Sequence, residues 1–401
     1  MTRLEAAGIS RLHDLMAAHV DMGQMPGLIA FVARGDDVHV EVLGTPSFKD
    51  PTPLARDAIF RIASLTKPIT AVTALTLVED GTLRLDDPID DLVPELANRR
   101  VLRAIDAELD DTVPAHRAIT VDDLLTFRMG FGTVLAPPDA YPIQRAEAEL
   151  DLRSIGGPPW PPGPLDVDGW IKALGSLPLM SQPGERWMYN TGAQVLGVLI
   201  ARATARDLDA VMRERIFEPL GMADTGFVVP DDRLRRLTTF YAPDPETDEL
   251  SVLDGPPDTW WSRSPRFPDA SGWLVSTIDD YWTFASMLAG GGTCNGVRVL
   301  SADWVARMTA DHVTAAQRVG EEVFFPPYAS WGLGLAVPAR GTEASAPPCG
   351  YGWDGGTGTA WRTNAHHGVT GILLTQRAMT SPEPPRVFDD FWSGVNAAAG
   401  I

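Results

Sequence analysis

Runs of residues that favour β-strands lie near both ends of this 401-residue chain, and helical patterns fill much of the middle. Near the start, Leu28–Ala33 and Val38–Leu43 flank Arg-Gly-Asp-Asp, whose turn chemistry predicts a hairpin. Near the end, Trp331–Val337 and Ile372–Gln376 are short apolar runs bounded by turn residues, which predicts further strands. This order favours an α+β fold in which the two chain ends build one sheet and a helical segment is inserted between them.

Two lobes follow from this order and from a length that exceeds a usual single domain. We expect residues 1–85 and 270–401 to form the α/β lobe that carries the sheet, and residues 86–269 to form a mostly helical lobe with long loops. The proline-rich Gly156–Pro164 excludes helix and central strand, which leaves an ordered loop or a disordered linker. Apolar spacing and capping residues predict helices over Leu4–Val20, Ser64–Asp80, Ile119–Phe127, Val195–Ala203 and Leu208–Ile216, and from Ser301 through Trp304.

Charge and composition exclude several kinds of partner. Acidic residues outnumber basic ones by 53 to 33, and a polyanion of this kind is repelled by nucleic-acid phosphates and anionic membranes. The first residues lack the apolar core of a secretory signal, and no run is long enough to span a bilayer, so we expect a soluble cytoplasmic protein. The two cysteines, Cys294 and Cys349, allow at most one disulfide and lack zinc-binding spacing.

Ser64-Leu-Thr-Lys67, at the start of a predicted helix, is the strongest chemical signal in the sequence. Residues i and i+3 share a helix face, so the Lys67 amine can reach the Ser64 hydroxyl. A serine becomes nucleophilic when a base takes its proton, and a lysine is a base only when neutral; the helix N-terminus and partial burial both lower its pKa. Only three of the 33 basic residues are lysines, so a lysine here rather than an arginine favours catalysis. A helix-capping serine followed by an exposed lysine is the alternative.

Other catalytic patterns are weak or missing from the sequence. It contains no Gly-x-Ser-x-Gly nucleophile elbow and no His-Glu-x-x-His motif. His366 and His367 are adjacent, which in a strand would point them to opposite faces and argues against a shared metal. The glycine run Gly350–Gly358 has no lysine after it and so is not a phosphate loop, although its amides could approach a ligand. We therefore expect no metal and no cofactor.

Several sequence blocks occur in the order found in one group of enzymes. The chain resembles the serine beta-lactamase-like hydrolases, which include class C beta-lactamases, D-aminopeptidases and carboxypeptidases, and family VIII carboxylesterases. The likeness runs over most of the chain in the blocks Phe60–Thr70, Leu83–Ile89, Ile119–Thr126, Pro183–Tyr189 with Val195–Gly197, and Ile216–Thr225. It implies a beta-lactamase-like fold with an antiparallel sheet flanked by helices.

The resemblance also gives Tyr189 a catalytic role. Tyr189 would share the proton of Ser64 with Lys67 and later protonate the leaving group, its own pKa lowered by the adjacent cation. A half-buried tyrosine beside Trp187 is the alternative. The second family motif often reads Tyr-x-Asn, whereas this chain has Tyr189-Asn190-Thr191, which puts the substrate-directed amide in doubt.

The third family motif is a lysine or histidine, or a tryptophan in some esterases, followed by two small residues. It aligns best with Asp354-Gly355-Gly356, so an acid stands where a cation would bind the carboxylate of a penicillin, and the acid would repel that carboxylate. The backbone amides of Ser64 and Thr357 would form the oxyanion hole.

These residues predict a serine hydrolase that works through an acyl-enzyme on Ser64, with small-molecule esters as the expected substrates. Hydrolysis of D-amino-acid peptides or other amides, beta-lactam hydrolysis and acyl transfer to a small alcohol are alternatives within the same family. A binding protein that keeps the scaffold but has lost hydrolysis is an alternative of a different class. Five tryptophans could line an apolar acyl pocket or fill core edges: Trp160, Trp170, Trp260, Trp261 and Trp273.

Overall fold

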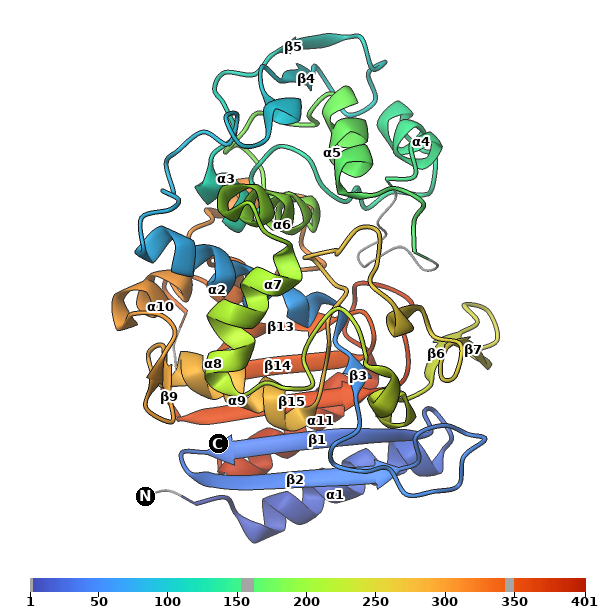
Figure 1. Ribbon diagram of the computed structural model, residues 1–401. Coiled ribbons are helices and arrows are strands. Elements are labelled where there is room, and N and C mark those ends of the chain that lie inside the picture. The colour runs from blue at the N-terminus through green and yellow to red at the C-terminus, as the bar shows by residue number, and fades with distance from the viewer. Residues whose placement is uncertain (1–2, 153–161, 343–349) are drawn as a thin grey trace.

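A seven-stranded antiparallel sheet forms the centre of the computed structural model, which describes residues 3–152, 162–342 and 350–401 (Figure 1). Its strand order is β11-β12-β13-β14-β15-β1-β2, so strands from the start of the chain extend the sheet beside its last strand. This confirms the predicted α+β fold and the joining of the two chain ends. The strands are β1 (Gly27–Arg34), β2 (Asp37–Gly44), β11 (Ala329–Trp331), β12 (Ala336–Pro338), β13 (Tyr351–Gly355), β14 (Thr359–Asn364) and β15 (Val369–Thr375).

Helices cover both faces of the sheet, which explains why β1 is apolar at nearly every position. Ala30 belongs to the small core beneath α1 and α11, whereas its neighbour Phe31 faces the main core and contacts Trp282 of α9, with ring centroids 4.7 Å apart. Successive strand residues point to opposite faces, so a strand buried on both sides needs apolar residues throughout. The covering helices are α1 (Ala6–Asp21), α11 (Arg386–Ala399), α2 (Thr66–Glu79) and α9 (Ile278–Ala289).

The middle of the chain carries most of the other helices, and Figure 1 shows its teal segments at the end opposite β1 and β2. Its helices are α3 (Val121–Leu125), α4 (Pro142–Glu149), α5 (Val167–Ser176), α6 (Thr191–Thr204), α7 (Leu208–Met212), a π-helical turn (Arg213–Phe217) and α8 (Glu218–Leu220). Short paired strands are β3 (Phe60–Arg61) with β8 (Val275–Ser276), β4 (Arg100–Leu102) with β5 (Thr112–Pro114), β6 (Phe240–Pro243) with β7 (Leu250–Asp254), and β9 (Thr293–Cys294) with β10 (Val297–Arg298). The remaining helices are α10 (Ala302–Met308) and the 3-10 helices Ala63–Leu65, Pro94–Leu96, Asp231–Arg236, Trp260–Ser262 and Ala315–Arg318.

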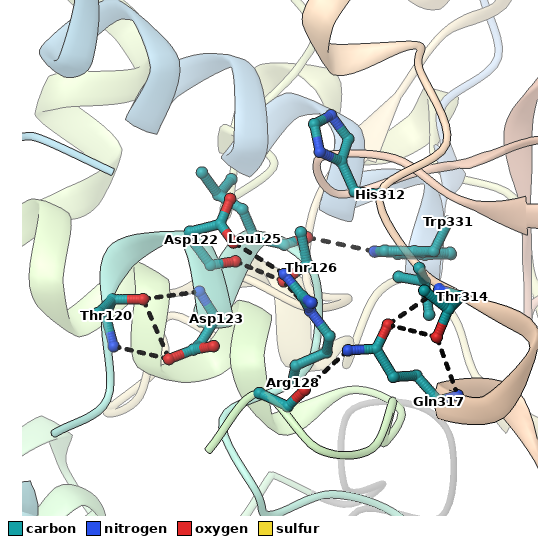
Figure 2. Close-up of polar contacts among 12 residues, drawn as sticks. Thr120, Asp122, Asp123, Leu125, Thr126, Arg128, His312, Thr314, Gln317 and Trp331 are labelled. Carbon is teal, nitrogen blue, oxygen red and sulfur yellow. Dashed lines mark hydrogen bonds and ion pairs between the residues drawn. The ribbon is translucent and has the colours of Figure 1, made fainter. Parts of the chain in front are cut away.

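Polar contacts at α3 show how the helical part joins the sheet (Figure 2). Thr120 and Asp123 form a reciprocal capping box that satisfies free amides at the start of α3. At the end of the same helix, the Leu125 carbonyl accepts a hydrogen bond of 3.2 Å from the indole of Trp331, which belongs to β11. A cap and a buried bond between distant segments therefore hold this helix against the sheet.

Most predicted elements are present, with one correction. The hairpin and the helices around α1, α2, α3, α6, α7 and α10 form where the local patterns predict them. The run Trp331–Val337 was predicted as one strand, and this is wrong, because a turn divides it between β11 and β12. The Gly332 amide donates to the Leu335 carbonyl, and Gly334 has a φ of 83°, which favours glycine.

Some expectations fall outside what the structure describes. Trp160 and most of the proline-rich segment lie within residues 153–161, and Cys349 lies within residues 343–349; both ranges are outside the described residues. The division into lobes at residues 85 and 270 stays a prediction. Within the described ranges, no helix combines the length and apolar character needed to cross a bilayer.

Candidate active site

Ser64 lies in a strained turn just before α2. The turn is the 3-10 helix Ala63–Leu65, so the serine precedes the α-helix that was predicted to carry it. Ala63 has a φ of 40°, in a region that costs a residue with a side chain roughly 1–3 kcal/mol. Two hydroxyls hold the preceding carbonyls in place: Thr357 donates to the Arg61 oxygen at 2.6 Å, and Thr359 donates to the Ile62 oxygen at 3.1 Å. The turn after β13 and the start of β14 thus clamp the serine segment.

Lys67 contacts the serine directly. Its Nζ donates to Ser64 Oγ at 2.8 Å and to the Ser271 carbonyl at 2.7 Å, and it lies 4.6 Å from the ring centre of Tyr189. Only 1% of Lys67 is exposed. Burial lowers its pKa from 10.5 to about 7, and the charge of Asp269 acts in the opposite direction. Full burial therefore makes a substantial fraction of this amine neutral near pH 7.

Tyr189 completes a cluster of three polar groups. Its Oη donates to Ser64 Oγ at 2.8 Å and accepts a hydrogen bond from Trp353 Nε1 at 3.1 Å. The backbone after it turns sharply into α6, since Asn190 has a φ of 80°. The structure thus brings Ser64, Lys67 and Tyr189 together, as the spacing and the resemblance predicted.

The predicted lowering of the Tyr189 pKa is wrong. Burial raises the pKa to about 12, and the charges of Asp354 and Asp269 add to the increase, while the hydrogen bond to Ser64 and the one from Trp353 only partly oppose it. The Lys67 amine lies over the ring face, with its own hydrogen bonds directed to Ser64 and Ser271. Tyr189 is therefore a neutral phenol across the physiological range, which suits a proton donor.

Trp353 was missed by the sequence analysis. The third motif was aligned at Asp354, one residue later, although a tryptophan is known at its first place in some esterases. In the structure it is the Trp353 indole that touches the phenol of Tyr189, and its ring meets Trp331 edge-on at 4.8 Å. Moving the motif back by one residue would have found it.

The residues after Trp353 lie beside the nucleophile. A Cβ on Gly355 would lie 2.6 Å from the Ile62 carbonyl, so only glycine allows β13 to approach this closely. Gly356 lines a cavity together with Tyr189, and its carbonyl accepts from the Met379 amide at 2.8 Å. Thr357 holds the Arg61 carbonyl. The oxyanion role of the Ser64 and Thr357 amides stays a prediction.

Asp354 is held in an ion pair. Both of its carboxylate oxygens accept from Arg362 at 2.9 Å, so its charge is compensated within the protein. Asn190 and Thr191, the second-motif residues after Tyr189, are buried, and neither is among the described residues that line the two cavities near the cluster.

A buried carboxylate near the cluster, Asp269, was also missed by the sequence analysis. Its oxygens accept from the Ser271 amide at 2.7 Å and from Gln194 Nε2 at 2.9 Å. Ser271 in turn accepts from Lys67, so Asp269 and Gln194 fix the segment that holds the amine. No local motif identifies this residue, because Gln194 and the Lys67 amine, which connect it to the cluster, come from distant parts of the chain.

Two cavities flank the cluster. The first, of about 470 Å³, is here called the Tyr189 cavity, and its described lining includes Tyr189, Phe324, Trp353 and Gly356. The second, of about 380 Å³, is lined by Trp170, Trp260, Trp273, Gln194 and Asp269 among others. Three of the five predicted tryptophans thus line a cavity, whereas Trp261 is in the core, stacked on Trp273 at 4.4 Å.

The Ser64 hydroxyl is nearly covered. Ser64 is 1% exposed, and the ring of Phe324 stacks on Tyr189 at 4.7 Å. Tyr189, whose Oη contacts Ser64 Oγ, lines the Tyr189 cavity, so this cavity lies next to the serine. Among the residues that the structure describes, no group of three or more histidine, cysteine or acidic side chains is arranged to hold a metal ion.

Comparison with known proteins gives the same architecture. A sequence model of the family described as Beta-lactamase matches residues 12–389. The chain is 36% identical to Protein Rv1367c of Mycobacterium tuberculosis over 364 residues, which cover 89% of this chain and 87% of that protein. It is 28% identical to Esterase EstB of Burkholderia gladioli over 405 residues, covering 95% and 94% of the two chains.

Solved structures agree on the fold. The structure titled "EstCE1, a hydrolase with promiscuous acyltransferase activity" superimposes with a TM-score of 0.79 at 20% identity, covering 97% of this chain and 98% of that one. The similarity extends over nearly the whole length, in sequence and in fold. The chain belongs to the Beta-lactamase family and has its fold.

Proposed function

We propose that this protein is a carboxylesterase that cleaves small esters through an acyl-enzyme on Ser64. The observation that carries the proposal is the position of Ser64 Oγ, 2.8 Å from both Lys67 Nζ and Tyr189 Oη. One neighbour has a pKa near 7 and can accept a proton, and the other has a pKa near 12 and can donate one. A proton acceptor, Lys67, and a proton donor, Tyr189, thus both contact the Ser64 hydroxyl.

In the first half of the reaction, neutral Lys67 takes the proton of Ser64 as Oγ bonds to the ester carbonyl carbon. The bond to the alcohol oxygen then breaks, and that oxygen takes a proton from Tyr189, which is restored by the proton held on Lys67. In the second half, water loses a proton to the same pair and attacks the acyl carbon; the bond between that carbon and Ser64 Oγ then breaks, and Oγ takes a proton back from the pair. The products are an acid and an alcohol, with the enzyme unchanged.

The third motif supports esters rather than beta-lactams. A cation at the first place of this motif would bind a substrate carboxylate, but Trp353 stands there, and the charge of the adjacent Asp354 is paired with Arg362. An ester also expels an alkoxide, which needs less protonation than the amine of an amide, so a single phenol donor suits it. The name of the relative EstB, an esterase, supports the same choice.

Short-chain p-nitrophenyl esters give the direct test. Wild type should hydrolyse them, Ser64→Ala should be inactive, and a fluorophosphonate should label wild type at Ser64. Ser176→Ala, at an exposed serine in α5, is the matched control and should keep full activity. Equal rates for wild type and Ser64→Ala would refute the proposal, and a folded protein that neither hydrolyses nor becomes labelled would be a binding protein instead.

Acyl transfer to a small alcohol is the second candidate. Ser64 is 1% exposed and Phe324 covers Tyr189, so bulk water has poor access to an acyl-enzyme here. EstCE1, which has a similar fold, is described as a hydrolase with promiscuous acyltransferase activity. Adding an alcohol acceptor to the esterase assay and measuring the new ester against free acid separates the two reactions.

A further inference from the structure

The ion pair between Asp354 and Arg362 lies in the wall of the Tyr189 cavity. In the antiparallel pairing of β13 and β14, Asp354 faces Ala360 and Arg362 faces Gly352, so the two charged residues are diagonal neighbours on one face of the sheet. The guanidinium gives one Nη to each carboxylate oxygen, both at 2.9 Å, and one Nη also donates to the Trp361 carbonyl at 2.7 Å. About a fifth of each side chain is exposed. The pair is thus bidentate and still open to the cavity.

The other charged residues of the cavity wall make this ion pair important for the charge of the substrate that can bind. Among the described residues that line the cavity, Arg362 is the one cation, while Glu322 and Asp389 add two exposed carboxylates. Tyr189 lines the same cavity, so a molecule bound here lies next to the reacting groups. Any positive charge offered to a substrate must come from Arg362.

We propose that Asp354 is a specificity-determining residue, which occupies Arg362 and so restricts the Tyr189 cavity to esters without a negative charge. This rests on the proposed esterase function. An arginine with both forks free is a strong bidentate site for a carboxylate. Here a carboxylate of the protein already fills it, held in place by the sheet, and a substrate carboxylate would have to displace it while approaching Glu322 and Asp389. The cavity therefore accepts neutral or cationic groups and rejects anionic ones.

Matched esters test this in both orientations of the substrate. The acyl-side pair is the mono-4-nitrophenyl ester of glutaric acid and its primary amide; the alcohol-side pair is 3-acetoxybenzoate and 3-acetoxybenzamide. One pair carries its carboxylate on the acyl side and the other on the alcohol side. For the pair whose carboxylate lies in the Tyr189 cavity, wild type should hydrolyse the neutral ester faster than the anionic one. Asp354→Asn, which keeps the shape and releases the guanidinium, should raise the ratio of anionic to neutral kcat/KM by about tenfold or more.

Three further variants separate the pair from general charge effects. Asp389→Asn also removes one negative charge from the cavity, but Arg362 stays paired with Asp354. In this variant the ratio of anionic to neutral kcat/KM should change less than about threefold. Adding Arg362→Gln to Asp354→Asn should abolish the gain. Arg362→Gln alone leaves Asp354 uncompensated and should lower the ratio below that of wild type.

A binding measurement keeps the two proposals distinguishable. In a Ser64→Ala background, calorimetry should show 3-acetoxybenzoate binding more tightly after Asp354→Asn, with the amide unchanged, and thermal unfolding checks that each variant is folded. If wild type hydrolyses neutral esters but Asp354→Asn shifts neither the ratio nor the binding, the specificity inference is overturned and the esterase proposal stands. If no ester is hydrolysed yet Asp354→Asn gains anion binding, the esterase proposal fails and the assignment of Asp354 is supported.

Discussion

The charge of Lys67 sets the rate of the proposed reaction, and its pKa lets the size of the effect be worked out. Burial lowers that pKa to about 7, so about half of the amine is neutral at pH 7, about a tenth at pH 6 and about nine-tenths at pH 8. Because only neutral lysine can take the Ser64 proton, kcat/KM should fall about tenfold per unit below pH 7 and level off above pH 8. Tyr189, with a pKa of about 12, should not limit the rate in this range.

Two substitutions at this position test the same reasoning. Lys67→Arg keeps the charge but cannot lose its proton, and Lys67→Met keeps the length without any amine, so each should reduce kcat/KM by roughly 10²–10⁴-fold. Lys172→Arg, at an exposed lysine of α5, is the matched control and should behave as wild type. The assay is p-nitrophenyl ester hydrolysis from pH 5.5 to 9.

Stability separates lost chemistry from lost folding in Lys67→Met. The pKa of Lys67 in the folded protein lies below its unfolded value of 10.5. The folded protein therefore loses stability as pH decreases from 10.5 toward 7, by up to about 5 kcal/mol, because protonation is easier in the unfolded chain. The variant removes that cost and loses two hydrogen bonds, each worth about 1 kcal/mol. It should therefore unfold at a higher temperature than wild type at pH 6 while being inactive. A flat pH profile, or Lys67→Met activity within tenfold of wild type, would refute Lys67 as the base.

Three further predictions concern the surroundings of the cluster. Trp353→Phe removes the 3.1 Å hydrogen bond to Tyr189 but keeps an aromatic ring, so kcat on esters should fall about fivefold with little change in Tm. Gly355→Ala forces a Cβ against the nucleophile segment and should slow fluorophosphonate labelling at least about tenfold, whereas Gly356→Ala, where a Cβ meets no atom within 4 Å, should have a smaller effect. Burial raises the pKa of Glu321 from 4.5 to about 7, so its ionisation costs stability as pH rises through that interval; thermal unfolding should show Glu321→Gln more stable by up to about 3 kcal/mol at pH 8.5 and equal to wild type at pH 4. Equal stabilities at both pH values would contradict the last of these.

Local patterns predicted much of the fold because each depends on neighbours in the sequence. The hairpin of β1 and β2 follows from two apolar runs and a turn, and the start of α3 follows from Thr120 ahead of Asp123. The prediction of one strand over Trp331–Val337 was wrong because the turn inside this run depends on contacts with residues far away in the sequence. A Cβ on Gly334 would lie 2.3 Å from Ala71 of α2, so packing against α2 restricts this position to glycine.

In the candidate site, too, residues close together in the sequence could be predicted from local spacing, whereas distant ones could not. Ser64 and Lys67 are three residues apart, so a helical spacing was enough to predict that their side chains meet, although Ser64 lies in the 3-10 turn before α2. Tyr189 was found only through the family resemblance, because it is 125 positions from Ser64. Trp353 is 164 positions from Tyr189, and only the fold shows that its indole reaches the phenol.

By itself, the sequence determined most of the elements and the pairing of Ser64 with Lys67, since these follow from spacings of a few residues. Only the tertiary structure decided how the groups are charged. The Lys67 amine meets the Ser271 carbonyl from 204 positions away, Arg362 neutralises Asp354 across two strands, and burial shifts the pKa of Lys67 and Tyr189 in opposite directions. The reason is that desolvation and ion pairing depend on which atoms replace water around a group, and most of those atoms come from distant parts of the chain.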